Sequence, residues 1–235
     1  MEPAHPEFVP DASLSREEME SLQREVAAAA VFDDDLDLPE RPLVAGVDQA
    51  FRDEEAVSAI VLWRDGAVVE NVHAVTELEI PYIPGLLSFR EGGPILAAFE
   101  NLDHDPDLAL FDGSGRIHFR HAGLATHIGV ILDIPSIGVA KSLLCGTPTE
   151  SVDGLPKGAC VPIEADATVD APEGTVIGYA YQSRQFDSGR INPLYVSPGH
   201  RVSAETAVDL VEACGGEYKL PEPTRLADRY ADEMK

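Results

Sequence analysis

The chain has 235 residues, 44% of them hydrophobic, and its 42 acidic and 17 basic residues give a formal net charge of −25. A chain of this length can bury about 70% of its unfolded surface around one core, so we expect a single domain over residues 1–235. It has no apolar run long enough for a membrane span, and its acidic start does not resemble a signal peptide. We therefore expect a monomeric cytoplasmic protein without a membrane partner, with flexibility at residues 1–13 and about 222–235.

The acidic surplus has two explanations, disorder or adaptation to concentrated salt. Disorder fits only the two ends, because the rest of the chain has clear hydrophobic periodicity. In molar salt the Debye length falls to about 3 Å, so a dense carboxylate surface is screened and stays soluble. We therefore infer a protein from a halophile. The chain has only four lysines, Lys141, Lys157, Lys219 and Lys235.

The first half of the chain predicts one helix followed by three strands. Ser15 and Glu18 form a capping box ahead of an amphipathic pattern, which predicts a helix over 15 to about 31. Apolar runs at 43–47, 56–63 and 67–75 predict a strand and then a hairpin, since a Gly-containing turn separates the second and third runs.

The second half alternates helices with strands. Proline suits the first turn of a helix, so we expect a helix from Pro94 to about Leu102. The later pattern predicts a strand at 108–111, a helix at 121–132, strands at 137–140, 176–185 and 193–196, and a glycine-ended helix at 204–214. The order predicts an α/β fold with a mixed sheet, in which an antiparallel three-strand meander is followed by parallel strands and flanked by helices.

Two aspartates directly follow buried strand patterns. Asp48 ends the first apolar run and Asp112 ends the run at 108–111. Ligands of open α/β sheets collect at the carboxyl ends of parallel strands, so these two side chains are expected to converge. A pair of carboxylates suits Mg²⁺, with Mn²⁺ as a substitute. The alternative is that each aspartate only caps a turn.

The segment 81–91 reads PYIPGLLSFRE and strongly resembles the signature segment of the endonuclease V family. Further blocks similar to that family follow in order and extend the resemblance over about residues 40–214. They read GVD at 46–48, DG at 112–113, His118, GLA at 123–125, IGVAKS at 137–142 and SPGH at 197–200.

The resemblance implies an RNase H-like fold and a set of catalytic residues. Asp48, Glu91 and Asp112 would be the metal carboxylates, and His200 would lie near the metal or its attacking water. Lys141 would bind the scissile phosphate, and His118 is a further helper. The family commonly carries His or Asn where this chain has Ser114, so we expect weaker phosphate binding at that point.

The resemblance also implies a site for an extruded base. The two prolines stiffen a loop that can wedge into a base stack, and the flipped hypoxanthine would enter a pocket beside it. The residues expected to form the wedge and pocket are Pro81, Tyr82, Ile83, Pro84, Gly85, Leu87, Gly113, Gly123 and Leu144.

The implied activity is hydrolysis of the second phosphodiester bond 3′ to a deaminated adenine, which leaves a 3′-hydroxyl and a 5′-phosphate. The expected partner is DNA containing deoxyinosine, in DNA repair, and inosine-containing RNA is an alternative substrate. Two other functions stay open. One is a non-catalytic binder of lesioned nucleic acid, and the other is a different RNase H-like nuclease such as a junction resolvase, which would lack the PYIP segment.

Overall fold

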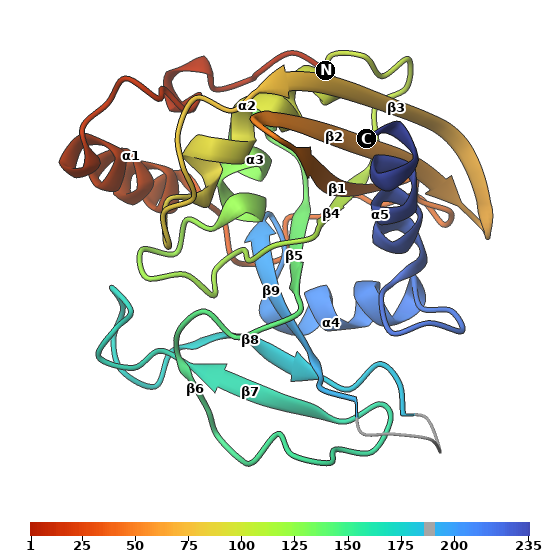
Figure 1. The fold of residues 1–235 in the computed structure, drawn as a ribbon. Helices are drawn as coiled ribbons and strands as arrows, with labels where there is room; N and C mark the ends of the chain where they lie inside the picture. The colour runs from red at the N-terminus through yellow and green to blue at the C-terminus, as the bar shows by residue number, and fades with distance from the viewer. Residues whose placement is uncertain (186–190) are drawn as a thin grey trace.

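A nine-stranded mixed sheet forms the centre of the fold in a computed structural model that describes residues 1–185 and 191–235 (Figure 1). The strand order is β3-β2-β1-β4-β5-β9-β8-β7-β6. The strands are β1 (Val44–Arg52), β2 (Glu55–Arg64), β3 (Ala67–Glu77), β4 (Leu108–Phe111), β5 (Ser136–Ala140), β6 (Thr147–Pro148), β7 (Cys160–Glu164), β8 (Val176–Tyr181) and β9 (Leu194–His200). Strands β1 to β3 form an antiparallel meander, and β4 and β5 run parallel to β1, so the predicted fold class is confirmed.

Helices cover both faces of this sheet. They are the short η1 (Pro6–Phe8), α1 (Arg16–Ala29), α2 (Leu87–Phe99), α3 (Leu124–Leu132), α4 (Ala204–Ala213) and α5 (Glu222–Met234). Ala45 and Val47 of β1 pack into the core on the side of α2 and α3, whereas Val44 packs into the core on the side of α4. No helix in residues 1–185 and 191–235 is long and apolar enough to cross a membrane.

Glycine at position 46 lets α5 begin directly on the sheet. A Cβ atom at Gly46 would lie 2.0 Å from the backbone carbonyl of Pro223, in the first turn of α5. Only a residue without a side chain permits this approach. Side chains alternate between the two faces of a strand, so residue 48 lies on the same face as residue 46, beneath α5.

Strand β1 and helix α2 are longer than the sequence pattern predicted. Strand β1 continues past Asp48 to Arg52 because it pairs with β2 along its whole length. Helix α2 begins at Leu87, and Pro94 lies inside it. The expected start at Pro94 was wrong because burial of Phe89 and Ile95 favours one continuous helix, in spite of the backbone hydrogen bond that proline cannot donate.

Three further boundaries differ, and two strands were not predicted. Helix α3 starts at Leu124, because His121 adopts a left-handed conformation with φ 56° that a helix cannot include. Strand β8 ends at Tyr181, and β9 extends to His200. Strands β6 and β7 complete the antiparallel half of the sheet; β6 has only two residues, and Pro162 in the middle of β7 weakens the strand signal.

Both ends of the chain, where we expected flexibility, contact the rest of the fold. The terminal ammonium of Met1 donates a hydrogen bond to the carbonyl of Phe99 at 2.7 Å. At the other end, α5 packs against β1 and β2, and Ala227 and Ala231 are buried in that contact.

Candidate active site

Three carboxylates meet where β1 and β4 emerge from beneath α5. Asp48 follows Val44 and Gly46 on one face of β1, and Asp112 follows Leu108 and Leu110 on the same face of the sheet. Asp228 projects from α5 onto that face, and one oxygen of each carboxylate lies within 4.8 Å of the others. The predicted convergence of Asp48 and Asp112 is therefore present, with a third carboxylate that the sequence analysis missed.

Asp228 carried a signal that could have identified it. The buried residues of α5 include Thr224, Ala227 and Ala231. Asp228 is four residues after Thr224 and one after Ala227, so it falls at the edge of the buried stripe of an amphipathic helix. A carboxylate on such a stripe is costly unless it is paired or binds a cation. Residues from about 222 to 235 were instead expected to be flexible.

Lys141 connects the cluster to the neighbouring strand. It directly follows β5, and its Nζ lies 2.5 Å from Asp112 Oδ2 and 3.9 Å from Asp228 Oδ1. Burial alone would lower the pKa of Lys141, but the hydrogen bond and charge of Asp112 outweigh it and raise the pKa. The ammonium is half-exposed and charged, so it can meet an anion that enters the cluster.

The carboxylates are held in an unfavourable electrostatic environment. Burial, and then repulsion from Asp112, raise the pKa of Asp48 to about 8. Burial also raises the pKa of Glu91 in α2 to about 7. One ammonium cannot neutralise this group of acids. A divalent cation would, and oxygen-only ligands at this separation fit the preferences of Mg²⁺ and Mn²⁺.

Glu91 lies at the same cavity but outside the tight cluster. It shares a lining with Asp48 and Asp112, and its backbone carbonyl accepts a hydrogen bond from Gln49 Nε2 at 3.0 Å. Glu91 lies in the first half of α2, four residues after its start.

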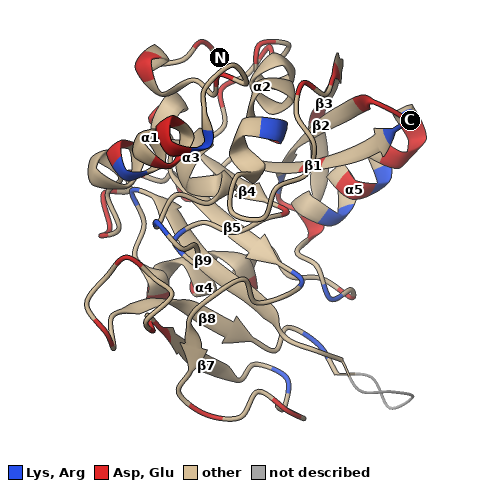
Figure 2. Ribbon diagram, turned by 60° about the vertical axis from the view of Figure 1, so that its left-hand side comes forward, with Lys and Arg blue, Asp and Glu red and all other residues tan. Residues whose placement is uncertain are grey.

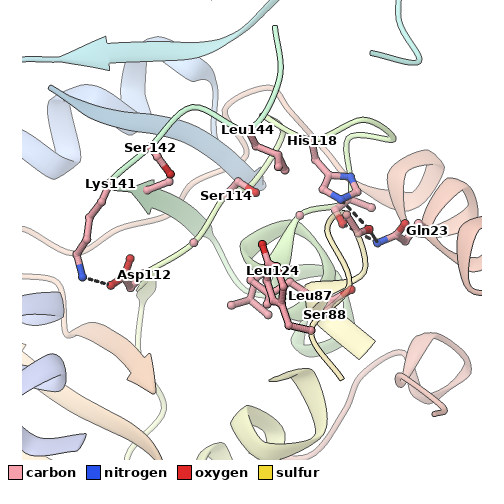
Figure 3. Close-up of a pocket in the computed structure, with 16 residues that line it drawn as sticks. Gln23, Leu87, Ser88, Asp112, Ser114, His118, Leu124, Lys141, Ser142 and Leu144 are labelled. Carbon is pink, nitrogen blue, oxygen red and sulfur yellow. Dashed lines mark hydrogen bonds and ion pairs between the residues drawn. The ribbon is translucent and has the colours of Figure 1, made fainter. Parts of the chain in front are cut away.

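A second cavity of about 280 Å³ adjoins the carboxylates (Figure 3). Figure 3 shows Lys141 and Asp112 at one end of it and His118 and Gln23 at the other. Of the residues predicted for wedge and pocket, the lining contains Tyr82, Gly85, Leu87, Gly113, Gly123 and Leu144. Pro81, Ile83 and Pro84 do not line it, and Ile83 packs instead against the cluster around Met19 and Phe89.

Tyr82 is the aromatic side chain that both cavities share. It is 63% exposed and lines the base-sized pocket as well as the cavity containing Asp48 and Glu91. An exposed aromatic ring that borders both the metal-ligand cavity and the base-sized pocket is free to stack on a base.

The far end of the pocket is fixed by the carbonyl of Gly85. This oxygen accepts hydrogen bonds from Gln23 Nε2 at 2.9 Å, His118 Nε2 at 3.1 Å and Arg120 Nη2 at 3.2 Å. The Nδ1 atom of His118 accepts from the backbone N–H of Arg120, so its Nε2 carries the proton. Gly85 has φ +79°, a conformation that glycine adopts without strain.

His118 therefore holds the loop and does not contact the carboxylates. Burial lowers the pKa of this imidazole to about 3, so it is neutral at pH 7. A neutral, buried ring with both nitrogens hydrogen-bonded is suited to positioning, so the expected catalytic helper is placed as a structural anchor of the pocket.

His200 lies at the opposite end of the sheet, and its predicted place beside the metal is wrong. It pairs with Ser136 at the start of β5, whereas Lys141 follows the end of that strand, about 16 Å away at the strand rise of about 3.3 Å per residue. Its Nδ1 accepts from the N–H of Val31, and its Nε2 donates to Asp133. The short motif carried no information about which end of the strand its histidine occupies.

The mixed sheet, with its carboxylate cluster, lysine and adjoining pocket, places the protein in the class of α/β nucleases. The family model described as Endonuclease V matches residues 21–229. The chain belongs to the endonuclease V family, as the sequence motifs indicated.

Individual relatives agree with this assignment. Endonuclease V of Natronomonas pharaonis is 63% identical, with 100% of this chain and 98% of the relative covered. The crystal structure of Endonuclease V from Streptomyces avermitilis matches with a TM-score of 0.83 and 33% identity, over 96% of each chain. Ciona intestinalis Endonuclease V, in complex with a 24mer DNA containing an inosine followed by a ribo-adenosine, matches with a TM-score of 0.76 and 28% identity, over 93% of this chain and 96% of that one.

Proposed function

We propose that this protein is a metal-dependent endonuclease that hydrolyses the second phosphodiester bond 3′ to a deaminated adenine, in the repair of DNA. The products would be a 3′-hydroxyl and a 5′-phosphate. The observation that carries the proposal is one continuous lining, in which a partly buried carboxylate cluster adjoins a pocket large enough for a base. The inosine-containing DNA bound by the Ciona intestinalis relative supports the choice of substrate.

The acidic residues would hold Mg²⁺, or Mn²⁺ in its place. Asp48, Asp112 and Asp228 would be direct ligands, and Glu91 would contribute from the cavity wall. When bound, the metal would supply an activated water and stabilise the leaving oxygen. Lys141 would hold the scissile phosphate through its half-exposed ammonium.

The pocket would recognise hypoxanthine by its hydrogen-bonding edge. Hypoxanthine has a keto oxygen and an N1–H, whereas adenine presents a donor and an acceptor in the reverse order. Gly113 and Gly123 both line the pocket. The N–H of Gly123 already donates to the carbonyl of Gly115, so backbone hydrogen bonds to the hypoxanthine edge would come from Gly113. Tyr82 would occupy the gap that the extruded base leaves in the stack.

The test uses matched DNA and RNA oligonucleotides with one inosine or none, incubated with Mg²⁺. The KCl concentration is about 2 to 3 M, because concentrated salt screens the acidic surface. We expect cleavage only with inosine, at the second bond on its 3′ side, and none with EDTA. Cleavage independent of inosine would favour another RNase H-like nuclease. Inosine-specific binding without cleavage would favour the non-catalytic binder.

A further inference from the structure

Three of the four lysines lie in a series that begins at the carboxylate cluster. Lys141 is close enough to Lys219 for its charge to lower the pKa of Lys219, although burial is the larger cause. Lys219 and Lys157 line one cavity of about 200 Å³. Figure 2 shows how few basic segments the ribbon carries among its acidic ones, as expected for 17 basic against 42 acidic residues. A gathering of lysines is therefore unusual in this chain.

These two lysines differ from Lys141 in having no carboxylate partner among the residues that the structure describes. Within residues 1–185 and 191–235, no ion pair involves Lys157 or Lys219, whereas Lys141 pairs with Asp112. One acid, Glu212, also lines their cavity, so the charged side chains there are two lysines and one glutamate. The lining carries a net positive charge in a chain of net charge −25.

An exposed aromatic residue belongs to the same lining and directly precedes Lys219 in the chain. Tyr218 is 54% exposed, and its ring is covered on one side by the guanidinium of Arg225 at 4.4 Å. Lysines interleaved with an exposed aromatic ring are typical of surfaces that bind a nucleic-acid strand, because ammonium groups contact phosphates and rings stack on bases.

The loop that carries Tyr218 and Lys219 is fixed to its surroundings. Ser183 Oγ donates a hydrogen bond to the carbonyl of Lys219 at 2.6 Å, and Arg184 Nε donates to the carbonyl of Glu217 at 3.0 Å. The lysine backbone is therefore positioned before any ligand arrives, which lowers the entropy cost of binding.

We propose that Lys219, Lys157 and Tyr218 form a second contact for the nucleic-acid strand, continuing from the scissile phosphate held by Lys141. The two ammonium groups bind phosphates beyond the cleaved bond, and Tyr218 stacks on a base or sugar. This inference rests on the proposed function, because it takes the same nucleic acid as its ligand.

The test compares Lys219→Gln and Lys157→Gln with Lys235→Gln, a matched change at the remaining lysine on the last residue of the chain. Binding is measured without divalent metal on two inosine oligonucleotides. One is long, and the other is trimmed so that it extends only about two nucleotides beyond the inosine on one side and beyond the scissile bond on the other. Each lost phosphate contact lowers the slope of log Kd against log salt by about 0.9 on duplex, or about 0.7 on a single strand.

For Lys219→Gln and Lys157→Gln we expect this lower slope on the long oligonucleotide and no change of slope on the trimmed one. On a long duplex, the loss of affinity should be about eightfold larger at 0.2 M than at 2 M KCl. The slope is taken over salt concentrations at which circular dichroism shows each protein folded. Tyr218→Ala should weaken binding of the long oligonucleotide at every salt concentration. Unchanged slopes in both lysine variants, or equal losses on the trimmed oligonucleotide and in Lys235→Gln, would overturn the inference. Failure of the wild type to prefer inosine would instead contradict the proposed function.

Discussion

The two ends of the base-sized pocket satisfy their buried polar groups in opposite ways. At one end, Asp112 belongs to a cluster with Asp48 and Asp228 that has the single ammonium of Lys141 beside it, and the pKa of Asp48 is raised to about 8. At the other end, the carbonyl of Gly85 accepts three hydrogen bonds, and His118 is neutral with both ring nitrogens paired. The first end is incomplete without a cation, whereas the second is complete as it stands.

This difference separates chemistry from recognition within one cavity. Buried charges without full compensation reduce stability but prepare a strong site for a divalent ion. A fully hydrogen-bonded anchor contributes rigidity and has no need of a ligand. Changes at the carboxylate end should therefore act on cleavage and metal binding, and changes at the anchored end on base recognition.

The largest effect is expected from the carboxylates. Asp48→Asn, Asp112→Asn and Asp228→Asn each keep the shape of the side chain but remove a charged oxygen ligand, so cleavage should fall by more than about a hundredfold. The measurement is kcat/KM on inosine DNA with Mg²⁺. The matched control is Asp232→Asn, an exposed position one turn further along α5, which should leave cleavage unchanged. Activity above about a tenth of wild type in any of the three would remove that residue from the metal site.

Tyr82→Ala should produce the next largest loss, because Tyr82 borders both ends. Stacking of one aromatic ring contributes about 1 to 3 kcal/mol, so cleavage of inosine duplex should fall by roughly 5- to 150-fold. A single-stranded substrate should lose less, since its base is already unpaired. Thermal melts control for folding and should barely move, since the ring is 63% exposed. Equal losses on both substrates would show stacking without strand opening, and no loss would leave Tyr82 as a surface residue.

Without metal, the pH dependence of stability should show the contrast directly. A raised pKa means that the folded state binds extra protons, so the stability from Asp48 and Glu91 is lost as pH rises through about 8 and about 7. Between pH 7 and 9 this loss should be about 1 to 2 kcal/mol. The lowered pKa values of His118 and His127, about 3 and about 4, act oppositely, and stability falls as pH drops below about 6.5.

Chemical denaturation in EDTA, repeated from acidic to alkaline pH, measures both the loss of stability at low pH and the loss at high pH. We expect a maximum at about pH 5 to 6, where the gain from the histidines gives way to the loss from the carboxylates, and Asp48→Asn should flatten the fall in stability from there to about pH 8. Adding Mg²⁺ to the wild type should restore stability at pH 8 to 9, because the ion binds the folded state and neutralises the carboxylates. A loss of stability at high pH that is the same in wild type and Asp48→Asn would contradict the view that this carboxylate is held in an unfavourable environment.

The sequence predicted those parts of the site that depend on local pattern. The capping box at Ser15, the short strand β4 and the convergence of Asp48 with Asp112 followed from alternation and strand parallelism. Helix α2 was placed too late because a proline usually marks a first turn, and here packing of Phe89 and Ile95 overrides that preference.

The parts that were missed depend on long-range packing. Asp228 reaches the cluster only because Gly46 lets α5 lie against β1, a contact between residues far apart in sequence. His200 was placed at the wrong end of the sheet because a short motif does not specify strand direction. The role of Gln23 was not predicted, since a helix residue gave no sign that it would meet the loop of Gly85.

The smallest effect we predict concerns Gln23, which connects α1 to the anchored end. Its side chain is fully buried, donates to the carbonyl of Gly85 at 2.9 Å and accepts from Arg120 Nε at 2.7 Å. Gln23→Leu keeps the bulk but removes both bonds, while His118 still holds the same carbonyl. One hydrogen bond contributes about 1 kcal/mol, so kcat/KM on inosine duplex should fall by about fivefold.

The distinguishing measurement for Gln23→Leu is the rise in melting temperature on adding Mg²⁺, which should equal that of the wild type because the carboxylate end is untouched. Ser21→Ala, at an exposed position of the same helix, is the control for a general effect on α1. A smaller Mg²⁺ response in Gln23→Leu would mean that the anchor also positions the metal ligands. An unchanged preference for inosine over adenine in that variant, with unchanged kcat/KM, would mean that His118 and Arg120 fix the loop without help from α1.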